Sequence, residues 1–471
     1  NLTVVTWLPP YHDMGLIGTL IQPIYVGGRN IIIKPFDFLK NPVIWLNAIT
    51  KYEGTTAGCP NFALDLLVER ISPEQKTDID LRSLKVLFCG SEPIRSASLK
   101  NFTQAFEQCG FTEDMFLPCY GLAENTLMLT GIHHSEKPEY LLADRQSLEN
   151  TNKVVISHDA DTALSFVSCG YPWLGDQVLI VDPEKHIASG EDTIGEIWTK
   201  SGSVCRGYRN QADKSEETFN ARINGSKEGP YMKTGDLGFM HNGHLYIAGR
   251  IKDVIIIRGM NHFPRDIENT VEHSHPTLQP NACAAFSSEI DNHERLIIIQ
   301  EIKRTAIREL DGQEVIEAIR SAISAEHEIP VFAIELISPG RMCKTTSGKI
   351  QHKKCKSMWI DKAFKSVYSW KQEFGECSKH TIYKGGDERN YENVQAWLVN
   401  WLSNKVKISP ESINPNKPIL SYGLDSLGAV ELERDVKEKF NIEIHLADFL
   451  ENNTISALVK IGLENTLKNT G

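Results

Sequence analysis

Ser426 follows Asp425 in the stretch SYGLDSLGAVELERDVKEKF (421–440), at the expected start of a helix. A serine here can cap the helix, because Ser and Asp accept hydrogen bonds from the unpaired N–H groups of a first turn. It can also be an exposed hydroxyl to which a group is attached, and the residues alone leave both interpretations open. Apolar side chains at helical spacing give this helix one apolar face: Ala429, Leu432, Val436 and Phe440.

A second set of polar residues lies in YMKTGDLGFMHNGHLYIAGRIKDVIIIRGMNHFPRDIE (231–268). Asp236 stands among glycines, so we expect its carboxylate to project from a tight turn, where two oxygens can accept bonds from both hydroxyls of a ribose. Arg250 follows Gly249 at an expected strand end. Each of these features alone is a weak sign of a binding site. The ordered series TGD, GR, KD, RG, H, P and IE is a much more specific sign.

Three further residues could carry chemistry. Lys349 lies in KTTSGKIQHKK (344–354), either as a solvated lysine of a Ser/Thr/Gly loop or as a catalytic cation. A P-loop is excluded because Ile350 follows this lysine where Ser or Thr is required. His12 is either a hydrogen-bonded structural histidine or a neighbour of a reacting group. Glu124 is either a cap or ion-pair partner, or a metal ligand.

Composition narrows the class of protein. The chain has 471 residues, 41% of them apolar and 24% charged, which predicts about three or four globular units. A formal net charge of −11 argues against nucleic acid as a partner and against docking on an anionic membrane. No run approaches the ~18 apolar residues of a membrane span. Ten cysteines without a CxxC pair indicate reduced thiols, so we expect a cytoplasmic protein.

The pattern of apolar runs predicts an α/β fold. Short runs at 29–36, 84–90 and 176–182, bounded by Gly, Pro and Asp and separated by helical patterns, indicate buried parallel strands. Strands with few helices follow over about 165–250. A compact α+β unit begins near residue 251, and a polar, glycine-containing segment at 371–390 is the expected linker.

Together these motifs resemble the adenylate-forming superfamily and, within it, the fatty acyl-AMP ligases. The resemblance covers roughly residues 2–356, in family order. Besides the stretches given above, it rests on WLPPYHDMGLIG (7–18), CGSEPI (89–94) and YGLAENT (120–126). Ala123 departs from many relatives, which have a hydroxyl residue before the glutamate. GLDSL (423–427) resembles the attachment motif of acyl and peptidyl carrier proteins, and about 391–467 fits one such domain.

The resemblance implies a role for each candidate residue. Those expected at the nucleotide are Asp236 and Arg250 for the ribose, Tyr120, Gly121, Ser91, Glu92 and Pro93 for the adenine, and Glu124 for Mg²⁺. Those expected at the reacting groups are Lys349 at the carboxylate and α-phosphate, His12 near the reacting end of the fatty acid, and Ser426 as the 4′-phosphopantetheine attachment site. Lys252 falls at the hinge about which the small domain rotates.

The implied architecture has four parts. Residues 1–250 would be the large adenylating domain, with its β-rich subdomain at about 165–250. Residues 251–370 would be the small mobile domain, 371–390 the linker, and 391–471 a four-helix carrier. In the family a phosphate-binding loop normally precedes the HDMG motif, and residues 1–7 are too short to supply it. We therefore expect an N-terminally incomplete adenylating domain that exposes apolar surface.

The implied function is ATP-dependent activation of a fatty acid as acyl-AMP, followed by transfer to the thiol on Ser426. ATP or AMP, Mg²⁺ and 4′-phosphopantetheine are the expected cofactors. A phosphopantetheinyl transferase and downstream polyketide or nonribosomal peptide synthase modules are the expected partners. Three alternatives remain: an acyl-CoA ligase, an amino-acid adenylation domain, and a truncated non-catalytic scaffold that only presents its carrier.

Overall fold

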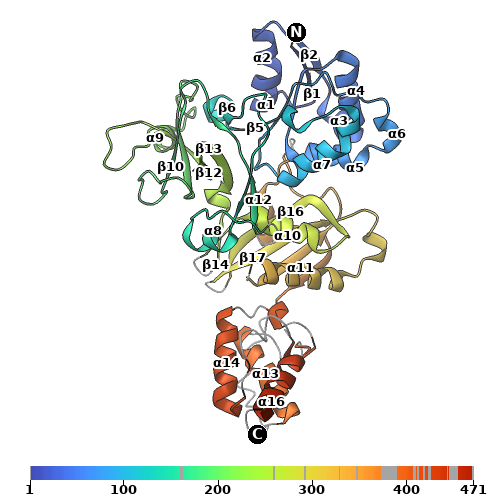
Figure 1. The fold of residues 1–471 in the computed structure, drawn as a ribbon, viewed down its shortest axis with the longest axis vertical. Coiled ribbons are helices and arrows are strands. Elements are labelled where there is room, and N and C mark those ends of the chain that lie inside the picture. The colour runs from blue at the N-terminus through green and yellow to red at the C-terminus, as the bar shows by residue number, and fades with distance from the viewer. Residues whose placement is uncertain are drawn as a thin grey trace. The chain divides into compact units, whose positions relative to one another are not determined.

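The computed structural model of the chain (Figure 1) forms two compact units, and each is described by itself. The first comprises Asn1–Val254 with Lys344–Lys349, and the second comprises Ile255–Cys343 with Ile350–Gly471. The structure describes residues 2–159, 163–257, 260–290, 293–327, 329–345, 348–372, 390–406, 410, 413–416, 419–422, 426–442, 444 and 454–468.

A seven-stranded sheet forms the centre of the first unit, in the order β2-β1-β3-β4-β5-β6-β9. Its strands are β1 (Thr3–Thr6), β2 (Arg29–Ile32), β3 (Thr56–Cys59), β4 (Val86–Cys89), β5 (Phe116–Gly121), β6 (Met128–Gly131) and β9 (Tyr171–Pro172). The first five are parallel, β6 pairs antiparallel with β5, and β9 pairs antiparallel with β6. The mixed α/β class predicted from the apolar runs is confirmed.

Helices accompany this sheet and supply much of its core. They are α3 (Pro35–Lys40), α4 (Val43–Tyr52), α5 (Asn61–Arg70), α6 (Pro73–Lys76) and α7 (Ser96–Phe106), with short 3₁₀ turns at Glu107–Cys109, Glu113–Met115 and Ala123–Asn125. Trp7 stacks on Phe38 with ring centroids 4.0 Å apart, and both are buried. The Trp45 indole donates to the Val5 carbonyl at 3.0 Å, which satisfies its buried N–H.

A helical segment follows β1 and carries exposed apolar side chains. It consists of α1 (Asp13–Gly15), the π-helix η1 (Leu16–Ile21) and α2 (Gln22–Tyr25). The large apolar residues exposed here and on the neighbouring β2 and α3 are Tyr11, Leu16, Ile21, Ile24, Tyr25, Val26, Ile32, Phe36 and Leu39. These side chains give this region an exposed apolar surface.

A four-stranded antiparallel sheet forms the β-rich part of the first unit. Its strands are β10 (Gln177–Val181), β11 (Gly195–Lys200), β12 (Met232–His241) and β13 (His244–Arg250), with α9 (Ala212–Phe219) between β11 and β12. The pair β7 (Tyr140–Ala143) and β8 (Leu164–Val167) and the helix α8 (Arg145–Thr151) lie earlier in the chain. Asn242 and Gly243 connect β12 to β13, with φ of 50° and 78°. Positive φ at both residues is required by the tight turn that suits a twisted hairpin.

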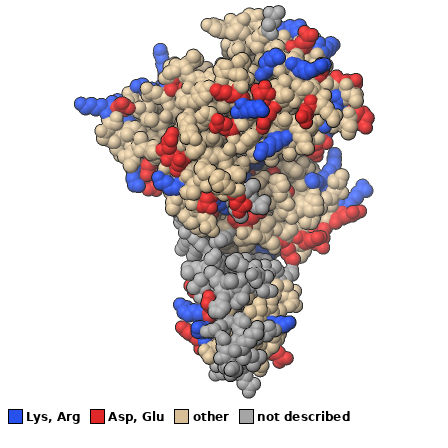
Figure 2. All heavy atoms as spheres, in the orientation of Figure 1, with Lys and Arg blue, Asp and Glu red and all other residues tan. Residues whose placement is uncertain are grey.

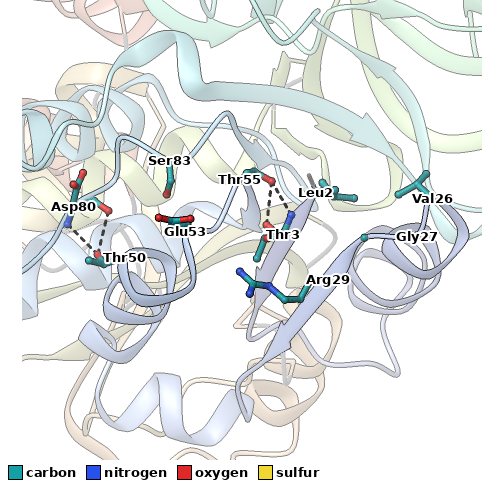
Figure 3. Close-up of a pocket in the computed structure, with 11 residues that line it drawn as sticks. Leu2, Thr3, Val26, Gly27, Arg29, Thr50, Glu53, Thr55, Asp80 and Ser83 are labelled. Carbon is teal, nitrogen blue, oxygen red and sulfur yellow. Dashed lines mark hydrogen bonds between the residues drawn. The ribbon is translucent and has the colours of Figure 1, made fainter.

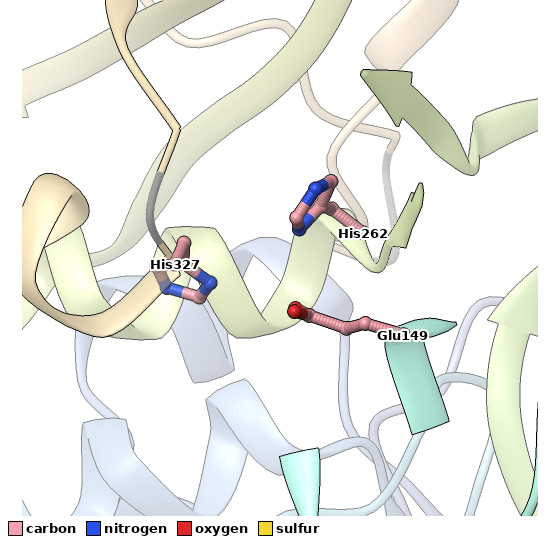
Figure 4. Close-up of side chains that lie close together, drawn as sticks. All are labelled: Glu149, His262 and His327. Carbon is pink, nitrogen blue, oxygen red and sulfur yellow. The ribbon is translucent and has the colours of Figure 1, made fainter. Parts of the chain in front are cut away.

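The second unit begins with a small α+β region. Its strands are β14 (Ile255–Ile257), β15 (Met260–His262), β16 (Leu278–Ile290), β17 (His293–Ile302), β18 (Val331–Ile337) and β19 (Ser366–Lys371), and its helices are α10 (Pro264–Ser274), α11 (Gly312–His327), α12 (His352–Ile360) and a 3₁₀ turn at Ile307–Glu309. His262 and His327 are buried in this region (Figure 4), and the Thr270 hydroxyl lies 2.8 Å from His327 Nε2. Glu149, also drawn in Figure 4, belongs to α8 of the first unit.

The last part of the chain is helical, as the sequence predicts. Its elements are α13 (Tyr391–Val406), the 3₁₀ turn η8 (Ile419–Tyr422), α14 (Ser426–Phe440) and α16 (Ile455–Lys468). Leu432, Val436 and Phe440 are buried in its core, which confirms these three members of the apolar face. The side chain of Ala429 and most of the expected linker, 373–389, lie outside the described residues.

Two surface properties bear on partners. Among the described residues, no helix is long and apolar enough to cross a membrane. On the face shown in Figure 2, acidic and basic side chains of the first unit are interspersed.

Candidate active site

The candidate residues of the first unit follow the carboxyl ends of its parallel strands. The segment with His12 follows β1, the segment with Ser91 follows β4, and Tyr120 with Gly121 ends β5. Because parallel strands bring their carboxyl ends to one edge of a sheet, ligands of α/β proteins usually bind there. This edge is therefore where we expect a ligand site.

Asp236 is the centre of a buried polar cluster. Tyr120 Oη donates to Asp236 Oδ2 at 2.8 Å, and Arg250 Nε donates to Asp236 Oδ1 at 2.8 Å. Asp236 and Arg250 are direct partners across β12 and β13. The expectation that Asp236 projects from a tight turn is wrong, because it lies within β12, although Gly235 before it has a φ of 73°.

Burial and neighbouring charges determine the protonation states of Tyr120 and Arg250 in this cluster. Burial raises the pKa of Tyr120, and the Asp236 carboxylate raises it further, so the phenol stays neutral and donates. The same carboxylate is the main cause that raises the pKa of Arg250. Two hydrogen-bonded partners thus hold the Asp236 carboxylate in one orientation.

The Ser91–Pro93 loop is held by a residue that the sequence did not single out. Asn61, the first residue of α5, donates from Nδ2 to the Pro93 carbonyl at 2.8 Å and accepts from the Arg95 N–H at 3.2 Å. Ser91 adopts a φ of 75°, a conformation unusual outside glycine. Glu92 Oε1 is buried and has no hydrogen-bond partner in the structure. Since such an atom is costly, it marks a place where a ligand donor could bind.

Glu124 lies in a tight loop directly after β5. Here a side chain on Gly121 would come within 1.8 Å of the Leu127 carbonyl oxygen, so only glycine fits. Tyr208 Oη donates to Glu124 Oε1 at 2.8 Å. Burial, followed by this hydrogen bond, raises the pKa of Tyr208 to about 12. No sequence motif points to Tyr208, which lies 84 residues further along the chain.

Lys349 belongs to the first unit together with the rest of its short segment, 344–349. Burial lowers the pKa of Lys349, and the Arg250 guanidinium lowers it further, whereas the carboxylates of Glu92, Asp236 and Asp13 oppose this shift. These interactions bring Lys349 into the same electrostatic environment as Asp236 and Arg250. The structure therefore gathers these candidates, while their individual roles stay predictions.

The hydrogen bonds of His12 are those of a structural residue. Its Nδ1 lies 2.6 Å from Asp13 Oδ1 and 3.3 Å from the backbone nitrogen of Met14, at the start of α1. Although burial opposes ionisation of Asp13, the hydrogen bond with His12 is the largest of the contributions that lower its pKa. The π-helix η1 follows directly, and such distortions are frequent at functional sites. Both interpretations of His12 therefore remain.

The other two candidates lie elsewhere in the chain. Lys252 is exposed in the 3₁₀ turn Ile251–Asp253, just before Val254, where the first unit ends. Ser426 is the first residue of α14, as expected. Its side chain, and residues 423–425 before it, lie outside the described part.

A cavity of about 920 Å³ lies at the opposite edge of the central sheet (Figure 3). Thr3, Arg29, Thr55 and Ser83 line it, and these residues begin or precede β1, β2, β3 and β4. The cavity is thus at the amino ends of the strands and is not the candidate nucleotide site.

Three segments of the chain match known families. Residues 1–209 match AMP-binding enzyme, residues 252–369 match the Disco-interacting protein 2-like AMP domain, and residues 396–461 match the phosphopantetheine attachment site. An AMP-binding enzyme domain at 1–209 is therefore joined here to a phosphopantetheine carrier domain.

Individual AMP-binding relatives are similar over the first three quarters of the chain. The medium-chain-fatty-acid–[acyl-carrier-protein] ligase JamA of Moorena producens is 42% identical over 76% of this chain and 60% of its own length. The corresponding ligase TtuA of Teredinibacter turnerae is 33% identical over 78% of this chain and 58% of its own length. The chain thus spans about three fifths of these curated relatives.

Solved structures agree with this family. The fatty acid AMP ligase from Legionella pneumophila is 39% identical, with a TM-score of 0.54, over 79% of this chain and 64% of its own. McyG A-PCP, solved with phenylalanyl-adenylate, has a TM-score of 0.70 over 98% of this chain and 67% of its own. At 22% identity, this second likeness shows the fold alone.

Proposed function

We propose that this protein activates a fatty acid with ATP as an acyl-adenylate and transfers the acyl group to a pantetheine thiol on Ser426. One observation carries the first half: Tyr120, at the carboxyl end of β5, and Arg250 both donate to Asp236, and the charges of Arg250 and Asp236 act on Lys349. The names of the relatives, fatty-acid–[acyl-carrier-protein] ligases, supply the substrate class.

Each member of the cluster has a physical task in this reaction. Asp236, oriented by Tyr120 and Arg250, accepts hydrogen bonds from the ribose hydroxyls. Carboxylate attack on ATP brings two anions together, so the reaction needs positive charge where charge gathers on the α-phosphate. Lys349 supplies that charge from a half-buried position, where few waters compete. Tyr120, Gly121 and the Ser91–Pro93 loop enclose the adenine.

Glu124 fits a magnesium ion by its chemistry. Mg²⁺ is usually held by one or two carboxylates together with substrate phosphates, and Glu124 presents a half-buried carboxylate positioned by Tyr208. The ion, when bound, neutralises phosphate charge. Tyr208 limits the rotation of the Glu124 side chain by its hydrogen bond.

The carrier domain supports the second half of the proposal. A thiol tethered in the same chain reaches an effective concentration of ~mM for a short flexible linker. Lys252, beside the end of the first unit, serves as the hinge that lets Lys349 leave before the thiol enters. A phosphopantetheinyl transferase must load Ser426, and polyketide or nonribosomal peptide synthase modules would take the acyl group onward.

An acyl-CoA ligase is the second candidate, because some relatives carry that name. The putative fatty-acid–CoA ligase FadD21 of Mycobacterium tuberculosis is 36% identical over 75% of this chain and 62% of its own length. In that case free CoA would accept the acyl group.

Intact mass spectrometry separates these possibilities. The chain is incubated with a phosphopantetheinyl transferase, CoA, ATP, Mg²⁺ and a medium-chain fatty acid, and the acyl-CoA product is measured in parallel. We expect a pantetheine adduct and then an acyl-pantetheine adduct on the protein. Ser426→Ala should remove both, whereas Ser421→Ala, a control in the same stretch, should retain them. A pantetheine adduct on Ser426→Ala contradicts the carrier assignment, and acyl-CoA as the main product favours the second candidate.

A further inference from the structure

Four sulfur-containing side chains meet in the second unit, beyond the candidate active site. Met342 and Cys343 follow β18, and Cys355 and Met358 lie on α12. The Cys343 thiol lies 3.2 Å from the Met358 sulfur, and the Cys355 thiol lies 3.7 Å from the Met342 sulfur. We call these four residues the four-sulfur cluster.

We propose that the four-sulfur cluster binds one soft monovalent cation of the Cu(I) class. Thiolate and thioether ligands together select Cu(I) over harder ions. A tetrahedral ion with metal–sulfur distances of about 2.3 Å holds its sulfurs about 3.8 Å apart. The two observed separations, 3.2 Å for Cys343–Met358 and 3.7 Å for Cys355–Met342, are close to that value.

The surroundings of the cluster both favour and oppose such an ion. Met342, Cys343 and Cys355 are buried in an apolar cluster, whereas Met358 is only half-buried and gives access from solvent. Two thiolates with one monovalent cation carry one net negative charge. Burial of that charge and the nearby Glu268 carboxylate, which also raises the pKa of Cys355, oppose binding and limit the affinity of the site.

Binding must release protons from the thiols. Burial raises the pKa of the Cys355 thiol to about 12, and the neighbouring Cys343 side chain is the next cause. Cys355 is therefore protonated at neutral pH without the ion, and the cation displaces the proton as it forms its bond with sulfur.

The cluster also lies at the base of the Lys349 segment. Cys343 immediately precedes Lys344, and the Cys343 carbonyl accepts from the Gln351 N–H at 2.9 Å. An ion bound by both Cys343 and Cys355 would link the part of the chain before the segment 344–349 to the part after it. The inference concerns metal binding alone and does not depend on the proposed adenylation.

A competition titration tests the site. The reduced apo chain is titrated anaerobically with Cu(I) against a chromophoric Cu(I) chelator, since oxidation of the two thiols would remove the donors. The variants are Cys343→Ser/Cys355→Ser, Met358→Leu and, as a control, Cys205→Ser, which alters an exposed cysteine outside the cluster.

We expect the wild type and Cys205→Ser to hold one more equivalent of Cu(I) than the double variant. X-ray absorption of that equivalent should show sulfur neighbours at about 2.3 Å. Equal stoichiometry in the wild type and the double variant overturns the proposal. If the double variant does not fold, the Cu(I) affinity of Met358→Leu tests the site instead, because this volume-conserving change is tolerated. At least ten-fold weaker binding supports the site, and unchanged affinity overturns it.

Discussion

Replacing Asp236 by Asn tests the proposed ribose site while changing little else. The carboxylate accepts one hydrogen bond from Tyr120 and one from Arg250, each at 2.8 Å. The amide keeps one oxygen that can still accept from the phenol. The Arg250 side chain is 60% exposed, so its ion pair is screened by solvent and contributes little to stability. The free energy of unfolding should therefore fall by only about 1 kcal/mol.

The effect on nucleotide binding should be larger. A hydrogen bond to a charged group contributes about 1.5–3 kcal/mol and a neutral one about 0.5–1.5. Asp236→Asn weakens the bonds to two ribose hydroxyls, which amounts to about 2–3 kcal/mol. This corresponds to a Kd for AMP that rises roughly 30- to 150-fold.

Calorimetric titration with AMP and 2′,3′-dideoxy-AMP measures this effect. The wild type should strongly prefer AMP, and Asp236→Asn should lose most of that preference. Glu113→Gln is the matched control, because Glu113 also accepts from a tyrosine hydroxyl, that of Tyr140, at 2.7 Å but lies outside the cluster. If Asp236→Asn binds AMP as the wild type does, or keeps the full preference for the ribose hydroxyls, the proposed role of Asp236 is wrong.

Three further changes have definite expected outcomes. Burial and Arg250 lower the pKa of Lys349, so the rate of pyrophosphate release should decline as the pH rises through that lowered pKa, at a lower pH than for an ordinary lysine. Lys349→Arg should lack this decline, since a guanidinium keeps its charge. Gly121→Ala should lower the melting temperature and AMP affinity together, because the added carbon overlaps the Leu127 carbonyl; loss of neither would contradict the loop geometry. Leu432→Ala should destabilise the carrier domain by about 2–4 kcal/mol in denaturant titration, and an unchanged midpoint would refute its core position.

The pattern of apolar runs was sufficient to predict the α/β class. The resemblance to fatty acyl-AMP ligases indicated the residues that the structure gathers, and it assigned Asp236 and Arg250 to the same ribose. The strand that carries Asp236 was missed, because Gly235 next to it predicts a turn, whereas ladder pairing with β13 keeps the segment extended. Local propensity was overridden by tertiary structure at this position.

The supporting residues could not be predicted, because their partners are distant in the chain. Asn61 acts on a carbonyl 32 residues away, and Tyr208 acts on a carboxylate 84 residues away. Neither forms a local motif. The four-sulfur cluster was missed for a related reason: MC and CxxM are not recognised spacings, and only the packing of α12 brings them together.

The Asn242–Gly243 turn has a consequence for how this hairpin can diverge. Asp236 pairs with Arg250 because the two-residue turn pairs His241 with His244, and because a bulge between Leu237 and Gly238 then shifts the register by one residue. Inserting or deleting one residue in the turn would place the Asp236 side chain on the opposite face of the hairpin. Length variation among natural sequences should thus be suppressed at this turn, or compensated by a second indel nearby.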